Sequence, residues 1–459
     1  MAPEQYSTPG RKAIDHALNK RLVFDIIRYQ KSSLAMTSCD LKSCYDRIVH
    51  VPATMAMFWA GASAEPVSSM FSTIENTMHT TRTAYGDSSK KYGGQENYRA
   101  PIMGVGQGNG CGPQVWAAVS SAMFEVMRKR GLTTHFCLPI TKESLSLCGF
   151  SYVDDTDLIQ AMGTTSTSNN PEETIQKMQE SVDCWEGVAT STGGAIATDK
   201  SWWYIIHFDW NNGKWSYGNL DFLLNDSLTC RDKDGVRQEL KFIPANQAVE
   251  MLGVYLAPDG NNKAQFGKMK KQAQYYGEII RTGHVDRHET WTTLTKVAMK
   301  ALEYSLPAMT LTEDECTSIM WPLLQASLPR SGVNQYFPRD VLYSKASLNG
   351  VGLKNLFLTQ GIAHLSDIVS NLWSKTITGH LITQCLEHLR LEIGVSGNIL
   401  QLDYYQHQPL ILTSSWIENT WQFFTDFGIH LNPNITEIPM RREFNNVRLF
   451  KGITTCIQY

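Results

Sequence analysis

Apolar positions recur at helical spacing in RKAIDHALNKRLVFDIIR, residues 11–28, and predict an amphipathic helix there. The next apolar run, SSLAMTSC, is short and dense, and it predicts a strand that leads into Asp40. A helix is expected from about Ser43. The start of the chain therefore indicates a mixture of helix and strand.

The same spacing rules predict further helical and extended segments along the chain. GFSYVDDTDLIQ, residues 149–160, has apolar runs on both sides of a polar centre and predicts a strand pair. NNG between WWYIIHFDW and KWSYG is a strong hairpin signal, and EMLGVYLAPDG predicts another strand and turn. The other predicted elements are a helical and then extended segment at 66–85, a glycine-rich loop at 93–113, helices at 113–131 and 172–190, a polar linker at 163–172, mostly helical structure at 263–320, mixed helical structure to residue 389, and an irregular, aromatic-rich tail at 390–459.

Composition narrows the class of protein. A chain of 459 residues is too long for one ordinary core and suggests two or three domains. Hydrophobic residues make up 42% and charged residues 19%, which is typical of a globular, soluble protein. No apolar run approaches the ~18 residues that span a bilayer, and the amino terminus has no apolar signal core. We therefore expect an intracellular protein without a membrane partner, and nucleus and cytoplasm are not distinguished.

Cysteines and net charge add two weaker constraints. The ten cysteines include no CxxC pair, which favours reduced, mostly buried thiols over disulfides or a zinc site. The net charge of −3 does not favour a nucleic-acid partner. It does not exclude one either, because a locally charged groove matters more than the total charge.

The carboxylates of YVDD are the first candidates for chemistry. Asp154 and Asp155 are adjacent at the expected tip of a hairpin. Neighbouring carboxylates repel, so ionising both is costly unless positive charge lies close, and a bound cation would supply it. A solvated turn is the alternative interpretation, because Asp is common in turns. We interpret the third carboxylate, Asp157, as a solvated or capping group.

Two other features accompany this hairpin. Asp40 ends the first predicted strand, a usual place for a ligand at a sheet edge, although it could instead cap the helix that follows. Glycine alternates with other residues from Gly104 to Gly112, but no frame matches G-x-G-x-x-G and no Walker lysine follows. Nucleotide binding of the Rossmann or P-loop kind is therefore unsupported. What remains is a loop that lets a backbone or a base pair approach closely.

Taken in order, these features resemble the palm of a reverse transcriptase. DLKSCYD, which starts at Asp40, resembles motif A, QGNGCGPQVW resembles motif B, and YVDD resembles motif C. GGAIATDKSWW, with Lys200, resembles motif D, and MLGVYL resembles the motif E strand. SLPAMTL, the Pro338–Arg339 pair and GVGLKNL resemble the thumb of non-LTR retroelement polymerases. The resemblance covers residues 11–370.

The resemblance implies an α+β fold. A polymerase palm, with an antiparallel sheet and helices on one face, would be followed by a mainly α-helical thumb. The implied domains are a remnant of the fingers with a lead-in helix at 1–35, the palm at 36–260, the thumb at 261–389 and a C-terminal extension of unknown role at 390–459.

The resemblance also implies an activity, that of an RNA-directed DNA polymerase. Such an enzyme adds deoxynucleoside triphosphates to the 3′ end of a DNA primer on an RNA template. Two Mg²⁺ ions, with Mn²⁺ as an alternative, stabilise the attacking and leaving oxygens and need hard oxygen ligands. By resemblance, Asp40 and Asp154 bridge the metals at a carboxyl separation of roughly 4 to 6 Å. Asp155 assists, the carbonyl of Leu41 adds a ligand, and Lys200 protonates the departing pyrophosphate.

Substrate-binding residues follow from the same resemblance. Tyr45 would pack under the sugar and exclude a 2′ hydroxyl, whereas simple core packing is the alternative. Gln107 and Gly108 would lie against the incoming nucleotide and template, unless Gln107 is only a loop amide bonded to backbone. Lysines near the start of the thumb would meet phosphates, and an ordinary solvated helix face explains them equally well. These nucleic-acid candidates are Lys268, Lys270 and Lys271.

Departures from the family pattern keep other functions open. Motif A begins 40 residues into the chain, and the fingers segment that grips the triphosphate is not found ahead of it. Gly112 replaces the usual motif B serine, and Trp116 replaces the usual aromatic. No endonuclease or ribonuclease H pattern is seen. The alternative is an inactive, truncated or domesticated fragment that binds nucleic acid. A viral RNA polymerase is disfavoured, because that class usually carries Asp at the position of Tyr45 and G-D-D in motif C.

Overall fold

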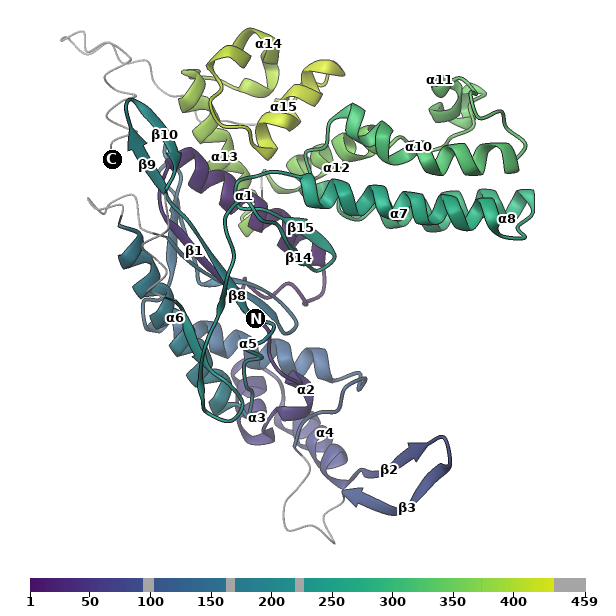
Figure 1. Cartoon of the computed structure of the whole chain (residues 1–459). Coiled ribbons are helices and arrows are strands. Elements are labelled where there is room, and N and C mark those ends of the chain that lie inside the picture. Colours follow the sequence, from purple (N-terminus) through teal and green to yellow (C-terminus); the bar gives the residue numbers. More distant parts are fainter. Residues whose placement is uncertain (94–102, 162–169, 219–226, 373, 433–459) are drawn as a thin grey trace, which may run out of the picture. The chain divides into compact units, whose positions relative to one another are not determined.

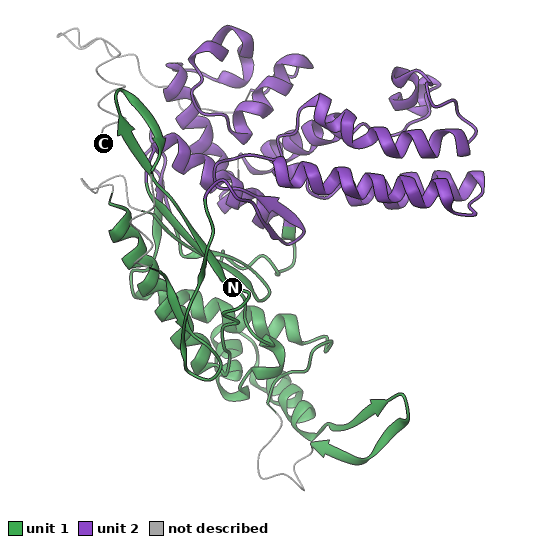
Figure 2. Ribbon diagram, viewed as in Figure 1, with its two compact units in different colours: residues 1–13, 33–135, 146–244 green, residues 14–32, 136–145, 245–459 purple. Residues whose placement is uncertain are grey.

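Two compact units make up the computed structural model of the protein, and each is assembled from separate stretches of chain (Figure 2). Unit 1 comprises residues 1–13, 33–135 and 146–244, and unit 2 comprises 14–32, 136–145 and 245–459. The four-domain division implied by the resemblance stays a prediction. The structure describes residues 1–93, 103–161, 170–218, 227–372 and 374–432, so most of the predicted polar linker lies outside the described residues.

Unit 1 is built on a five-stranded sheet in the order β13-β8-β1-β7-β6 (Figure 1). Neighbouring strands pair antiparallel except β13, which pairs parallel to β8. The mixture of this sheet with helices confirms the expected α+β class. The strands are β1 (Leu34–Cys39), β6 (Gly149–Tyr152), β7 (Asp155–Ala161), β8 (Trp202–Ile206) and β13 (Lys241–Phe242).

One face of this sheet is covered by α5 (Gly112–Lys129) and α6 (Pro171–Ser191). Ala35 of β1, Leu158 of β7 and Ile205 of β8 are fully buried and share a hydrophobic core with the two helices. Their register places them on the same face, because side chains alternate along each strand. Both helices form within two residues of their expected bounds, and Gly131, with a φ of 73°, follows the end of α5 as predicted.

Hairpins also form where turn residues predicted them. Asn212 and Gly213 have φ of 50° and 78°, as a two-residue hairpin turn requires, and they join β9 (Phe208–Asn211) to β10 (Lys214–Tyr217). In EMLGVYL, the prediction of a single strand was wrong. Leu252 and Gly253 both have positive φ and turn the chain, so β14 (Val249–Met251) pairs with β15 (Val254–Leu256) in unit 2.

The other elements of the first half of the chain are short. They are α2 (Cys44–Arg47), α3 (His50–Trp59), α4 (Ala64–Asn76), β2 (Met78–Thr83), β3 (Gly86–Gly93), β4 (Thr134–Cys137), β5 (Ser144–Leu147), β11 (Thr229–Arg231) and β12 (Arg237–Glu239).

Unit 2 is mainly helical over the range where helices were expected. Helices α7 (Lys263–Thr282) and α10 (Glu313–Arg330) pack closely, and Gly277 lets the backbone of α7 approach the carbonyl of Pro322. Among the described residues, no helix combines the length and apolarity needed to cross a bilayer. Besides most of α1 (Ala13–Gln30), the helices are α7 (Lys263–Thr282), α8 (Arg287–Thr292), a π-helical turn (Thr293–Ala298), α9 (Met299–Glu303), α10 (Glu313–Arg330), α11 (Arg339–Tyr343), α12 (Leu356–Asn371), α13 (Ile377–Ile393), α14 (Tyr404–His407) and α15 (Trp416–Asp426).

The expectation of an irregular tail was wrong for its described part. Helix α15 forms because the hydroxyl of Ser415 accepts a hydrogen bond from the backbone N–H of Glu418, which caps the first turn. Trp416, Trp421 and Phe424 are then fully buried. The spacing of Ser415 and Glu418 is itself a helix-start signal, but the polar residues between the aromatics obscured it.

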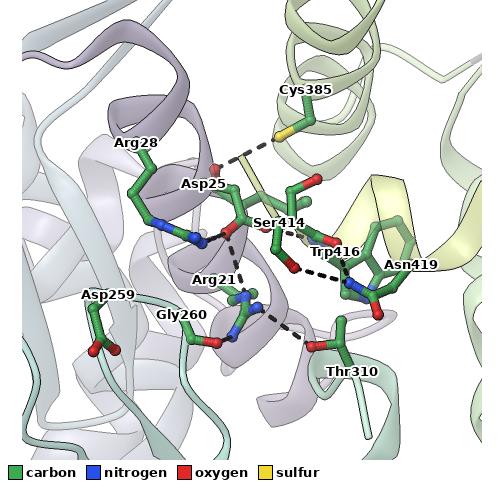
Figure 3. A network of polar contacts seen from close by, with 12 residues as sticks. Arg21, Asp25, Arg28, Asp259, Gly260, Thr310, Cys385, Ser414, Trp416 and Asn419 are labelled. Atoms are coloured by element: carbon green, nitrogen blue, oxygen red, sulfur yellow. Dashed lines mark hydrogen bonds and ion pairs between the residues drawn. The ribbon is translucent and has the colours of Figure 1, made fainter. Parts of the chain in front are cut away.

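Helix α1 forms as predicted, but it is not amphipathic. Every residue from His16 to Ile27 is buried, including charged ones. A polar network explains how the helix tolerates this burial (Figure 3). The Asp25 carboxylate lies 3.4 Å from Arg21 and 2.9 Å from Arg28, and it accepts a 2.7 Å hydrogen bond from the backbone N–H of Trp416. Arg21 in turn donates to the carbonyl of Gly260 at 2.8 Å.

Replacement of Asp25 by alanine should destabilise unit 2 by about 3–5 kcal/mol, because it leaves two arginines in the interior without their shared anion. Hydrogen exchange of the α1 amides would measure the loss. Asp87→Ala is the control, since Asp87 forms an exposed ion pair with Arg82 and its removal should leave protection unchanged. Equal protection in both variants would contradict the role of the network.

Candidate active site

The register of β1 against β7 brings the predicted carboxylates to one end of the sheet. Cys39, the last residue of β1, lies opposite Thr156, and Asp40 follows directly. On the neighbouring strands, Tyr152 pairs with Asp155 across a two-residue turn. Because β1 and β7 are antiparallel, the residue after β1 and the turn before β7 meet at the same edge.

Burial and neighbouring charges both shift the pKa of the Asp40 carboxyl. Burial raises the pKa of Asp40 above its usual value, the nearby Lys200 ammonium lowers it, and the charge of Asp154 raises it. Burial also raises the pKa of the Cys44 thiol to about 12, and the charges of Asp154 and Asp40 add to this. Asp40 and Asp154 therefore lie near enough to interact electrostatically. Their expected separation of about 4 to 6 Å stays a prediction.

Backbone pairing places the motif D segment beside Asp40. Leu41 forms an antiparallel bridge with Ile196, and the N–H of Ala197 donates to the carbonyl of Asp40 at 2.8 Å. This turn carries Lys200, whose Nζ lies 3.7 Å from Oδ2 of Asp40 although its side chain is 69% exposed. The bridge uses the Asp40 carbonyl rather than that of Leu41. The role of Leu41 as a metal ligand stays a prediction.

Asp40 is not a helix cap. Helix α2 begins at Cys44, and its cap position is occupied by Ser43. The backbone N–H of Asp40 instead donates to the hydroxyl of Ser201 at 3.2 Å. The helix-cap alternative for Asp40 was therefore wrong, and its carboxylate is left facing Lys200.

The glycine-rich loop contacts the segment that follows Asp40. Gly104 has a φ of 89°, and a Cβ there would lie 2.5 Å from the carbonyl oxygen of Asp46, so only glycine fits. The N–H of Gly104 donates to the carbonyl of Ile48 at 2.8 Å. The N–H of Gln107 donates to Oδ1 of Asp46 at 3.0 Å, which holds the loop in place, and Gly108 has a φ of 90° in open space.

Tyr45 lies against the start of α5. A Cβ on Gly112 would lie 3.2 Å from Cδ1 of the Tyr45 ring, so the glycine in place of the usual serine makes room for this ring. Burial raises the pKa of Tyr45 to about 12, and the charges of Cys44 and Asp154 contribute. Tyr45 is partly buried against the hydrophobic core of unit 1. Core packing is thus part of its role, and contact with a sugar stays a prediction.

The interpretation of Asp157 as a solvated or capping residue was wrong. Asp157 is fully buried within β7, opposite Ser38 of β1 and Phe150 of β6. Its charge contributes to the raised pKa values of Tyr204 and Cys39. Sequence suggested solvation because Asp is a turn residue, but the turn ends at Asp154 and Asp157 lies within β7.

Sequence reasoning missed two side chains that hold this site. The sequence marks Trp116 only as a variant aromatic of motif B, yet its indole N–H donates to the carbonyl of Val153 in the YVDD turn. His50 bridges Gly104 and α4, with one ring nitrogen 2.8 Å from the Gly104 carbonyl and the other 2.9 Å from Glu75. The only sequence signal was general, since a buried Trp usually seeks a partner for its N–H.

The arrangement of the possible metal ligands decides whether the carboxylates form a complete metal site. Among the residues that the structure describes, no group of three or more His, Cys, Asp or Glu side chains is arranged to hold a metal. Asp40, Asp154 and Asp155 therefore do not form a preassembled three-carboxylate cage. Mg²⁺ usually keeps several waters and uses one or two carboxylates plus substrate phosphates, so the donor set fits an ion that arrives with a triphosphate.

The three lysines predicted to bind nucleic acid differ in their surroundings. Nζ of Lys268 pairs with Glu250 and donates to the carbonyl of Gly253 at 2.8 Å. Lys270 donates to the hydroxyl of Ser318 at 2.9 Å. Lys271 is exposed on α7. Lys271 is thus the candidate best placed to reach a phosphate.

Comparisons with known proteins give little to add to this geometry. No protein-family model matches the chain, and no curated protein matches it. Among solved structures, the chain is similar to an apo telomerase from Candida tropicalis, at 11% identity and a TM-score of 0.33, over 83% of this chain and 57% of that one.

Two telomerase structures in complex with the TWJ fragment of telomeric RNA also match. The Candida albicans protein matches at 11% identity and a TM-score of 0.29, over 83% of this chain and 56% of that one. The Candida tropicalis protein matches at 12% identity and a TM-score of 0.30, over 83% and 53%. The chain thus spans little more than half the length of these chains. Because the TM-scores are low, we base the function on the site alone.

Removal of the Lys200 ammonium should raise the pKa of Asp40 further, because Lys200 is the group that lowers it. We expect Lys200→Ala to move the titration of the Asp40 carboxyl to higher pH, so that a larger fraction is protonated at mildly acidic pH. Carboxyl ¹³C NMR would measure it, with Lys200→Arg retaining the charge as the control. An unchanged Asp40 titration in Lys200→Ala would contradict the ion pair.

Proposed function

We propose that this chain is an RNA-directed DNA polymerase of the non-LTR retroelement type, with unit 1 supplying the palm. The observation that carries the proposal is the meeting of Asp40, the Val153–Asp154 turn and Lys200 at one edge of an antiparallel sheet. These residues come from three distant parts of the chain. A polymerase palm requires this meeting, whereas a solvated turn does not.

The electrostatics of the site suit a divalent cation. Burial opposes ionisation of Asp40 and the charge of Asp154 adds to this, and the Lys200 ammonium at 3.7 Å does not offset the two together. A hard cation between oxygen ligands would relieve the repulsion, and Mg²⁺ prefers such ligands. When bound, two such ions would stabilise charge on the attacking and leaving oxygens of nucleotide addition. Asp40 and Asp154 would hold both, with Asp155 and the Leu41 carbonyl assisting.

Other residues of the chain would orient the substrate. Gln107 stands on a loop fixed to Asp46 and would face the incoming nucleotide with Gly108. The Tyr45 ring would meet the sugar and disfavour a 2′ hydroxyl. Lys200, freed from Asp40 when a cation binds there, would give a proton to the departing pyrophosphate.

Primer extension tests this proposal. Asp154→Ala and Asp40→Ala should each lower RNA-templated extension with deoxynucleotides and Mg²⁺ by about a thousandfold, because charge stabilisation by metal is worth several kcal/mol. Asp87→Ala on the exposed β2–β3 hairpin is the control and should extend at the wild-type rate. Extension by the wild type that persists in Asp154→Ala would refute the assignment.

A second candidate is a nucleic-acid-binding protein without catalysis. The observation behind it is the exposed Lys271 on α7, which can reach a phosphate whether or not the carboxylates of unit 1 are catalytic. The two functions separate in the same assay. Retained binding of an RNA–DNA hybrid, with no extension by the wild type in either Mg²⁺ or Mn²⁺, would support the second candidate.

Nucleic-acid binding has its own test on α7. Lys271→Ala should weaken binding of an RNA–DNA hybrid duplex. The slope of the logarithm of the binding constant against the logarithm of the salt concentration should fall in magnitude by about 1, because one phosphate contact is lost. Lys268→Ala should change the slope less, since its ammonium is already paired with Glu250. Measurements over a range of salt by fluorescence anisotropy would show this. Equal slopes for Lys271→Ala and wild type would remove Lys271 from the interface.

A further inference from the structure

The turn of the YVDD hairpin has an unfavourable backbone conformation. Val153 has a φ of 57°, in the left-handed region that a β-branched residue rarely adopts. Such a conformation persists only where surrounding contacts determine it, and it is often found at functional sites. The residue that follows is Asp154.

Two donors from different elements meet at the carbonyl of Val153. The indole N–H of Trp116, from α5, donates to this oxygen. The hydroxyl of Ser151, from β6, donates to it at 3.2 Å. Trp116 and Ser151 are both almost fully buried, so neither bond competes with bulk water.

The Ser151 side chain is itself held by other polar groups. The Ser151 hydroxyl lies 3.0 Å from the hydroxyl of Thr156. The side-chain amide of Gln5 donates to the Ser151 hydroxyl at 3.3 Å and to the hydroxyl of Ser120 in α5 at 2.8 Å. The backbone of Ser151 also pairs with residues 4–6, which extend the sheet edge there. The donors to Val153 are therefore fixed before any substrate binds.

We propose that Trp116 and Ser151 are positioning residues which hold the Val153 carbonyl and thereby orient Asp154 toward Asp40. This inference rests on the proposed polymerase function for its consequence in catalysis. The physical reason is that the Val153 carbonyl and the Asp154 N–H belong to one planar peptide unit. Fixing the oxygen fixes the plane, and with it the direction in which Asp154 leaves the backbone.

The bond from Trp116 is not a general need of the fold. Trp185 and Trp203 are equally buried in unit 1, and within the described residues their indole nitrogens have no hydrogen-bond partner. The core of unit 1 thus accommodates a Trp whose N–H is unused. Trp116 differs because its N–H reaches the turn that carries Asp154.

The test compares Trp116→Phe with Trp185→Phe. Both variants lose a buried indole, but only the first loses a donor to the turn. The residual dipolar coupling of the Asp154 amide reports the orientation of the Val153–Asp154 peptide. It should change in Trp116→Phe and stay as in wild type in Trp185→Phe.

The same two variants should also differ in metal binding and in activity. Trp116→Phe should weaken Mn²⁺ binding, measured by electron paramagnetic resonance, and raise the Mg²⁺ concentration for half-maximal extension by about tenfold, as loss of a supporting contact does elsewhere. Trp185→Phe should change neither quantity. A merely structural role for Trp116 would lower the amount of folded protein without moving the Mg²⁺ requirement.

Ser151→Ala keeps the inference testable if Trp116→Phe does not fold. It should shift the same dipolar coupling, and the double variant should shift it further. Wild-type coupling in every folded variant would overturn the positioning role. A shifted coupling in a protein that never extends a primer would uphold the positioning role and remove the polymerase function instead.

Discussion

The antiparallel pairing of β1 with β7 is the constraint on which the candidate site depends. Thr37 faces Leu158 and Cys39 faces Thr156, so the strand ends with Asp40 beside the hairpin turn. A slip of one residue would move every side chain of β1 to the opposite face of the sheet and would shift Asp40 along the edge. The register is held because β1 is central, is buried at every position and pairs on both sides.

The same pairing assembles a site that is electrostatically unfavourable. Burial raises the pKa of Asp40, the Lys200 ammonium lowers it without cancelling the effect of burial, and the charge of Asp154 raises it further. A left-handed Val153 adds backbone strain. We attribute the persistence of the strained turn to the two hydrogen bonds that Trp116 and Ser151 donate to the Val153 carbonyl. This combination is characteristic of a site shaped for a ligand rather than for stability.

In unit 2, by contrast, a buried carboxylate has its charge fully paired. There Asp25 is fully buried, but two arginines and the N–H of Trp416 satisfy it. The amphipathic pattern expected for α1 failed because this network allows charged positions to be buried beside apolar ones. Segments from residues 259–262, 310 and 414–419 contribute to it, and no local pattern in α1 reveals partners so far along the chain (Figure 3).

By itself, the sequence determined the local elements: the strand before Asp40, the strand pair around YVDD, the helix at α5 and the glycine-rich loop that precedes it. These follow from spacing, capping and allowed φ, which are properties of neighbouring residues. Only the tertiary structure decided that Lys200 reaches Asp40, that Asp157 is buried and that Trp116 holds Val153. Those facts depend on strand register and on which buried donor meets which acceptor, and neither is encoded in the periodicity of a single segment.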